Sequence, residues 1–155
     1  MMNLAFAVDD SALTLQGLTA GTDVLTAEGA LAVEHVSAGD RIVTRSGLRS
    51  LRAVSVRIVR CAAMVCIGVD TLGVGRPDRE TLVPAGQHLM IRDWRATAMF
   101  GKPHAMIPAV RLVDGRLIRA AAQTDVRLFS LYFDGPEVIY AGGLELGCFA
   151  QTIPA

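Results

Sequence analysis

Residues 21–44 read GTDVLTAEGALAVEHVSAGDRIVT, and this stretch decides the fold class. It contains three short apolar runs, at residues 23–26, 31–36 and 41–44, with turns that carry Gly29 and Gly39 between them. Glycine favours tight turns because it reaches backbone angles that other residues avoid. Short runs rich in Val, Ile, Leu and Thr between such turns are typical of strands. We therefore predict a series of β-hairpins here.

The same rhythm continues along the chain. Residues 51–59 alternate, with Val54, Val56 and Ile58 on one face, and this pattern predicts a half-buried strand. The unbroken apolar run at residues 61–69 predicts a fully buried strand. Further strands are expected at residues 81–83, 88–91, 126–133 and 137–140. Turn signals about every 8–12 residues favour a sandwich or barrel-like fold, so we predict an all-β, compact single domain.

One or two short helices are expected in addition. Residues 96–100 could form one helical turn before Gly101, and Pro108 is suited to the first position of a second helix that runs to Val113. Residues 1–16 do not share the strand rhythm, and we interpret them as an N-terminal arm or an extra strand. The domain proper is then expected at residues 17–150, with a C-terminal tail at residues 151–155.

Length, composition and charge exclude several classes of protein. The chain has 155 residues, 52% of them hydrophobic, and a formal net charge of +0. This length fits one domain, and the apolar content excludes disorder. Because the net charge is zero, we expect no long-range electrostatic attraction to nucleic acid or to an anionic membrane. The apolar runs of the chain are too short to span a bilayer. A protein partner is left open, and no partner is identified.

The N-terminal segment does not resemble a secretory signal. No basic residue precedes the apolar residues 3–8, and Asp9 and Asp10 follow them. We therefore expect a cytoplasmic location, with secretion by a route that needs no such signal left open.

The cysteines predict neither disulfides nor a metal site. Their number is odd, and no export signal accompanies them, which argues against a disulfide framework. Cys61 and Cys66 lie in the apolar run, so we expect both to be reduced and buried. A zinc site needs four converging ligands, but His35, His88 and His104 are scattered along the chain. No metal and no cofactor are expected.

A further set of motifs, in order, resembles one family. These are Gly21–Thr26, Val33–Val36 and Gly39–Thr44, then Leu72-Gly73 with Pro77–Glu80, Leu82–His88, Ile107–Gly115 and Asp134–Gly143. Together they resemble bacterial Hint domains, the family of hedgehog and intein self-processing domains, over roughly residues 17–148. The resemblance implies the Hint fold, with its all-β architecture.

The resemblance also implies a site. In this family a Cys, Ser or Thr at the first residue of the domain attacks the preceding carbonyl, a histidine polarises the scissile amide, and a late Asp or His assists. In this chain the nucleophile position falls on Gly17, the histidine on His88 with a displacement of one residue, and the late acid on Asp134. Ser130 and Pro136 stand where late histidines would be expected, and the chain lacks the His-Asn ending that splicing requires.

Three hypotheses follow. The first is a degenerate self-processing domain that does not cleave itself, is not an enzyme, and serves as a binding or structural module, with His88 and Asp134 as relics. The second is an active autocatalytic domain with a shifted nucleophile, Thr19 or Thr22. The third is an unrelated β-rich hydrolase that uses His88 with Asp93 or Asp134. His88 could also simply bind a backbone carbonyl, and Asp134 is a normal turn aspartate.

Overall fold

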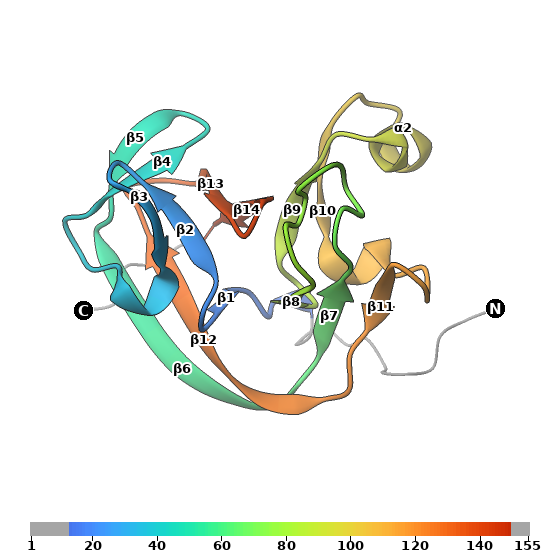
Figure 1. The fold of residues 1–155 in the computed structure, drawn as a ribbon, viewed down its shortest axis with the longest axis horizontal. Helices are drawn as coiled ribbons and strands as arrows, with labels where there is room; N and C mark the ends of the chain where they lie inside the picture. Colours follow the sequence, from blue (N-terminus) through green and yellow to red (C-terminus); the bar gives the residue numbers. More distant parts are fainter. Residues whose placement is uncertain (1–12, 150–155) are drawn as a thin grey trace.

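A long, curved pair of strands forms the base of the molecule. The computed structural model describes residues 13–149. In it β6 (Ala53–Ala62) pairs antiparallel with β12 (Thr124–Tyr132), with Phe129 opposite Val56. Figure 1 shows one group of short strands above each end of this pair, so that the base joins two lobes. The fold class is therefore β-rich, as the sequence predicts.

Three sheets organise the strands. The base carries a third strand, in the order β1-β12-β6. An eight-stranded sheet runs β10-β9-β14-β13-β2-β4-β5, with β3 paired to β2, and so links the two lobes. A three-stranded sheet has the order β11-β7-β8. The remaining bounds are β1 (Leu18–Thr19), β2 (Asp23–Thr26), β3 (Gly29–Ala32), β4 (Arg41–Thr44), β5 (Gly47–Ser50), β7 (Met64–Ile67), β8 (Thr81–Pro84), β9 (His88–Ile91), β10 (Ala105–Pro108), β11 (Ile118–Ala120), β13 (Glu137–Ala141) and β14 (Leu144–Cys148).

Both predicted helical segments are present. α2 (Trp94–Phe100) begins two residues earlier than the sequence suggests, because the Asp93 side chain caps it by accepting a hydrogen bond from the Arg95 N–H at 2.9 Å. It ends at Gly101, whose left-handed backbone (φ 67°) is a typical helix C-terminus. The segment after Pro108 forms a short 3-10 helix, Ala109–Leu112. A second 3-10 helix, Val33–His35, replaces the strand end that was predicted at residues 33–36.

The prediction of one buried strand at residues 61–69 is wrong. Cys61 ends the exposed part of β6 in a left-handed conformation (φ 50°), and β7 begins only at Met64. The Cys61 N–H donates to the Asp125 carboxylate at 2.9 Å, which fixes the bend. Cys61 is therefore exposed, contrary to expectation, whereas Cys66 is buried as predicted. An apolar run does not reveal a bend that a distant carboxylate stabilises.

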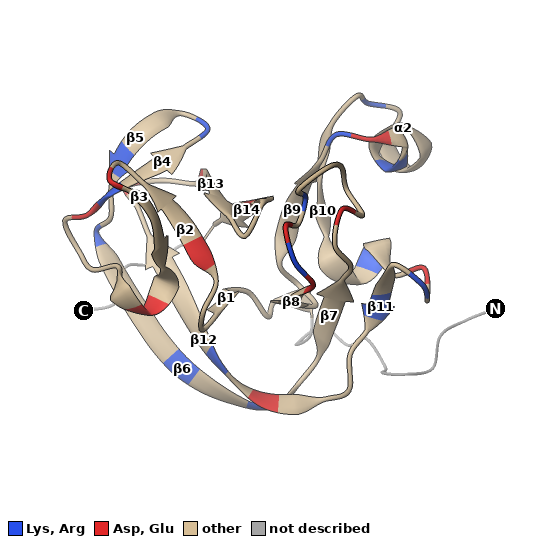
Figure 2. Ribbon diagram, in the orientation of Figure 1, with Lys and Arg blue, Asp and Glu red and all other residues tan. Residues whose placement is uncertain are grey.

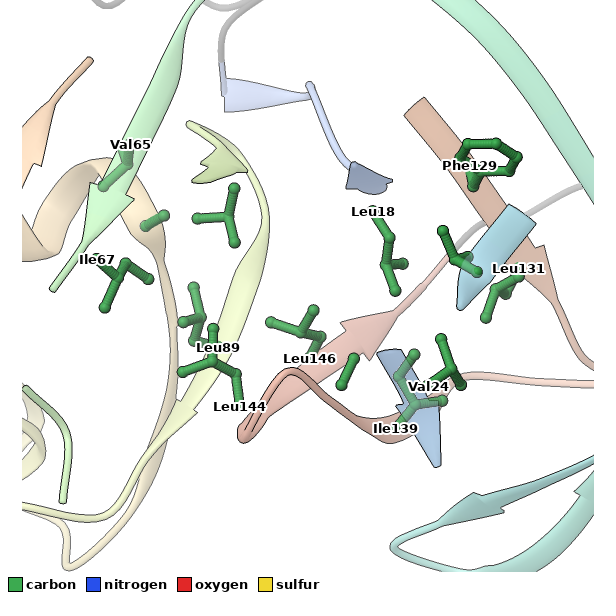
Figure 3. Packing of buried hydrophobic residues seen from close by; sticks show 14 of the residues in the cluster. Leu18, Val24, Val65, Ile67, Leu89, Phe129, Leu131, Ile139, Leu144 and Leu146 are labelled. Atoms are coloured by element: carbon green, nitrogen blue, oxygen red, sulfur yellow. The ribbon is translucent and has the colours of Figure 1, made fainter. Parts of the chain in front are cut away.

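The main core lies between the lobes and above the base. Figure 3 shows that Leu18, Phe129 and Leu131 of the base face Val24 and Ile139 of one lobe, with Leu146, Leu89 and Ile67 continuing into the other. The predicted apolar face of residues 51–59 is only partly buried, since Val56 is 53% and Ile58 68% exposed. A second, small cluster forms from Ala62, Met64 and Leu128, and Leu15 packs against it.

The two ends of the chain fall outside the structural description. The arm expected at residues 1–16 is described only from residue 13, and the tail expected at residues 151–155 lies beyond the described residues. Within residues 13–149, no helix has the length and apolarity needed to cross a membrane.

Candidate functional site

Position 17 directly precedes the first strand of the domain. β1 pairs with β12, with Leu18 opposite Phe129. Gly17 itself has φ +132°, a conformation that residues with side chains rarely adopt. A Cβ atom at this position would lie 3.1 Å from the Phe129 carbonyl oxygen and 3.3 Å from the Leu128 Cβ. Both the backbone conformation and the surrounding space therefore suit glycine here, and a nucleophilic side chain would require the backbone to shift.

A buried glutamine contacts the peptide group at this position. The Gly17 N–H donates to Oε1 of Gln87 at 2.9 Å. The Gln87 amide nitrogen in turn donates to the Gly147 carbonyl at 2.8 Å and to the His88 carbonyl at 3.1 Å. The side chain is only 1% exposed, so its hydrogen bonds replace those that water would otherwise make. Gln87 thus ties the start of β1 to the end of β14.

A small cavity of about 30 Å³ lies beside this contact, with walls that include Gln16, Gly17, Gln87, Ser130 and Cys148. Its volume suffices for about one or two water molecules. Two side chains in its wall could act as nucleophiles. They are the Ser130 hydroxyl on β12 and the Cys148 thiol on β14.

The Cys148 thiol is a poor nucleophile in this environment. Burial raises its pKa to about 12, and the nearby Glu137 charge acts in the same direction. The thiolate is the nucleophilic form of cysteine, so at pH 7 only roughly one molecule in 100,000 carries the reactive species.

His88 follows Gln87 in the sequence but does not line the cavity beside Gly17. It begins β9, where it is opposite Pro108, and its ring contacts the Phe149 ring edge-on at a centroid distance of 5.7 Å. Burial lowers the pKa of His88, and the Gly86 backbone opposes this shift. Nδ1 is buried and has no hydrogen-bond partner of good geometry among residues 13–149. The imidazole is thus neutral at pH 7, and the contact to Gly17 is made by the residue before it.

The structure places the two aspartates away from Gly17. Asp134 lies in the exposed turn between β12 and β13, where its side chain is 85% exposed and forms an ion pair with Arg52 at 3.3 Å. Asp93 caps α2 and pairs with the Arg95 guanidinium. Neither residue lines the cavity beside Gly17. The roles suggested for them in catalysis stay predictions, and a structural role is visible for each.

The two alternative nucleophiles, Thr19 and Thr22, form a hydrogen bond with each other. The Thr19 and Thr22 hydroxyl oxygens are 3.2 Å apart, and Thr19 Oγ1 also lies 3.4 Å from the Leu82 carbonyl, to which it donates. Both residues line an open groove of about 310 Å³ together with Asp23, Arg79 and Glu80. The contacts shown for the two hydroxyls are thus a threonine pair and a backbone carbonyl, and neither contact supplies a base.

Gln87 is the site residue that the sequence analysis missed. The family pattern directs attention to the histidine, and the bond from Gly17 to Gln87 spans 70 positions, so no local pattern shows it. One signal was present: Gln87 is a lone amide between Val83 and Ile91, in a stretch otherwise built largely of apolar and small residues. A polar side chain in such a run has to find partners when the segment is buried.

Comparison with known proteins identifies the family. The model of the Hint domain family matches residues 16–152, which is most of the chain. The chain therefore belongs to the Hint domain family. A search of curated proteins finds no match.

Solved structures of inteins share the fold. The bacterial intein-like domain from Clostridium thermocellum superimposes with a TM-score of 0.64 at 14% identity, over 88% of this chain and 100% of that one. The gp41-1 intein gives 0.54 at 10% identity, over 86% and 98%. The MchDnaB-1 intein gives 0.54 at 17% identity, over 83% and 98%. At these identities the likeness concerns the fold alone.

Proposed function

We propose that this Hint domain, formed by residues 17–150, is a degenerate self-processing domain that leaves its own chain intact and serves as a structural or protein-binding module. The observation that carries the proposal is the glycine at position 17. The family reaction begins with a side-chain oxygen or sulfur at this position, and Gly17 has neither. Its φ of +132° and the 3.1 Å approach to the Phe129 carbonyl further suggest that the backbone has adapted to glycine.

The contact with Gln87 supports the same proposal. Cleavage of an amide needs a proton donor for the leaving nitrogen. The Gln87 oxygen does the opposite, because it accepts a hydrogen bond from the Gly17 N–H. An acceptor at the N–H favours the planar, conjugated amide, and a carboxamide has no titratable proton to deliver. The Gln16–Gly17 peptide bond is therefore held in its stable form.

The other side chains near this bond do not replace the missing nucleophile. Cys148 lines the same cavity, but its raised pKa keeps it protonated. Ser130 also lines the cavity, and a serine hydroxyl needs an adjacent base to become nucleophilic. The His88 ring, which could act as such a base, packs against Phe149 instead.

The experiment is an intact-mass measurement of the full chain. The protein is incubated for days at pH 7, with and without hydroxylamine or a reducing thiol, both of which trap ester and thioester intermediates. We expect the full-length mass throughout. A fragment that begins at residue 17 would show a nucleophile-independent cleavage, and one that begins at residue 19 or 22 would favour the active domain with a shifted threonine. Either result would overturn the proposal.

A further inference from the structure

The longest strand of the protein has a free edge. β6 is 10 residues long and stands at the end of the sheet order β1-β12-β6, so β12 is its only strand partner in the part of the chain that the structure describes. The other strands at sheet edges, which are β1, β3, β5, β8, β10 and β11, have 4 residues or fewer. Figure 1 shows β6 along the outside of the base. Among the described edges, this one is long enough to pair with a further strand over many residues.

The outer side of the β6 backbone has unpaired polar groups. In an antiparallel pair, the N–H and C=O groups of every second residue point toward the neighbouring strand, and those of the other residues point away from it. β12 pairs with β6 along its length, from Ala53 to Ala62. Within residues 13–149, no further backbone hydrogen bond is made by residues 53–60. The outward groups of β6 are therefore a template for another strand.

The side chains in the middle of β6 are exposed on both faces of the sheet. Val56 and Ile58 are 53% and 68% exposed. Val56 lies opposite Phe129, a residue of the main core, so both apolar side chains are on the face that is directed toward the core. Arg57 is also exposed and lies opposite Leu128. Because successive side chains alternate, Arg57 is on the other face.

The long strand pair carries more arginines than carboxylates. Its charged residues are Arg57 and Arg60 on β6, with Asp125 and Arg127 on β12, and Figure 2 shows basic and acidic positions along the base in blue and red. The Asp125 carboxylate accepts a backbone hydrogen bond at the end of β6. None of the ion pairs within residues 13–149 involves Arg57 or Arg60. The free edge therefore presents two guanidinium groups that have no carboxylate partner.

We propose that the free edge of β6 binds an extended polypeptide segment in which apolar residues alternate with Asp or Glu, and that this segment adds a strand beside β6. In this mode of recognition, backbone hydrogen bonds supply affinity and alternate side chains supply specificity. The apolar residues of the added strand lie beside Val56 and Ile58, and its carboxylates lie beside Arg57 on the other face. A second copy of this chain is disfavoured, because pairing β6 with β6 brings the arginines of two chains together.

This inference rests on the binding role in the proposed function, to which it gives a surface and a partner. It does not depend on Gly17 or Gln87. The loss of self-cleavage is tested by the intact-mass measurement, and the free edge is tested by peptide binding, so that failure of one is distinguishable from failure of the other.

The test uses the full chain labelled with ¹⁵N and a synthetic peptide of 10 residues, the length of β6, in which valine and glutamate alternate. Backbone amide signals are followed by NMR at pH 7.5, and amide hydrogen exchange is measured with and without the peptide. We expect saturable shifts centred on residues 54–60 and slower exchange of the outward amides of β6. A peptide with lysine in place of glutamate should bind about tenfold more weakly, because Arg57 and Arg60 repel it. Equal affinities, shifts centred on another strand, or shifts that do not saturate would refute the proposal.

Charge reversal locates the site. Arg57→Glu should weaken the binding of the glutamate peptide about tenfold and strengthen that of the lysine peptide, because the central charge changes sign. Arg116→Glu is the matched control, since Arg116 is exposed, lies outside β6 and forms no ion pair within residues 13–149. It should leave both affinities nearly unchanged. Backbone NMR spectra show whether the variants are folded, and Arg57→Gln removes the charge with less perturbation. A folded Arg57→Glu protein that keeps the preference of the parent chain for the glutamate peptide would disprove the assignment.

The chain without peptide tests the competing occupant. Amide exchange of β6 and the sedimentation coefficient are measured over a range of protein concentrations. We expect neither to change, because the arginines oppose pairing between two β6 edges. A dimer whose formation slows the exchange of the β6 amides would show that a second copy occupies the edge, and this result would overturn the proposal.

Discussion

The Gln87 side chain accepts a hydrogen bond of 2.9 Å from the Gly17 backbone N–H, at the peptide bond that the family motifs predict as the start of self-processing. In the proposed function, a carboxamide with no titratable proton stands where the chemistry would call for a proton donor. The same side chain bonds to two further backbone carbonyls, so its role is to connect segments of the fold. This relationship leads to the first prediction.

Gln87→Leu should destabilise the fold by about 2–4 kcal/mol, because it leaves the buried Gly17 N–H and Gly147 carbonyl without their partner. Urea unfolding monitored by circular dichroism measures the change. Gln123→Leu is the matched control, since Gln123 is exposed, and it should change the stability by less than about 0.5 kcal/mol. Equal stability of the two variants would show that the buried hydrogen bonds contribute nothing.

Gly17→Ala should destabilise the fold by about 1–3 kcal/mol because of the backbone angle and the crowding by the Phe129 carbonyl. Gly135→Ala is the control, since no atom lies within 4 Å of a Cβ placed there and its φ is ordinary.

Gly17→Cys should release no N-terminal peptide when thiols are added, because the crowding at position 17 lets its thiol approach the preceding carbonyl only after the backbone shifts. Thiol-dependent cleavage of this variant would show that the site is still competent.

The three cysteines should react with a thiol reagent at different rates. Cys61 is exposed and should be modified within minutes under native conditions, whereas the buried Cys66 and the partly buried Cys148 should react far more slowly until the chain unfolds. Burial raises the pKa of both, which lowers their thiolate fraction further. Mass spectrometry counts the modified sites. Cys61→Ser should abolish the fast phase, and a fast phase that persists in this variant would contradict the protection of the other two thiols.

His88 should make the folded state less stable in mild acid. Its pKa is lowered by burial, so the unfolded chain binds the proton more tightly than the folded chain. Above the unfolded pKa of about 6.5 the ring is neutral in both states, and the free energy of unfolding is at its full value. It decreases as the pH falls from there toward the lower pKa of the folded state. Urea unfolding between pH 8 and pH 5 should show this loss. In His88→Gln the loss over this range should be smaller, and an identical pH dependence would assign it to other groups.

Ionised Glu145 should stabilise the folded state, and this contribution should be lost in acid. Its folded pKa is lowered, chiefly by the hydrogen bonds from Arg92, so its contribution is present above about pH 4.5 and is lost as the pH falls through the folded value. Glu145→Gln should cost about 1–3 kcal/mol at pH 7, because it breaks a buried ion pair. The difference between the variant and the parent protein should shrink below pH 4.5. A difference that stays constant down to pH 3 would show that ionisation of Glu145 does not matter.

The sequence predicts the architecture better than the site. Alternation, β-branched residues and glycine-containing turns are local signals, and they predict most of the strands and the two helical segments. The bend at Cys61 was missed because the Asp125 carboxylate that fixes it lies 64 positions away. Gln87 was missed for the same physical reason, since its partners at positions 17 and 147 come close only after the chain folds. The family motifs direct attention to position 17 and to the segment around His88, whereas the hydrogen bonds between them depend on packing.

The three bonds of Gln87 also have a mechanical consequence. The chain enters the domain at Gly17 and reaches its last strand residues at Gly147, and one carboxamide holds both points, at 2.9 Å and 2.8 Å. A pulling force applied between residues 16 and 148 is therefore shared between this amide and the strand pairs that begin at Leu18 and end at Cys148. The two bonds act in series, so the link through Gln87 lasts only as long as both hold, and the loss of either one lets the start of β1 move away from the end of β14.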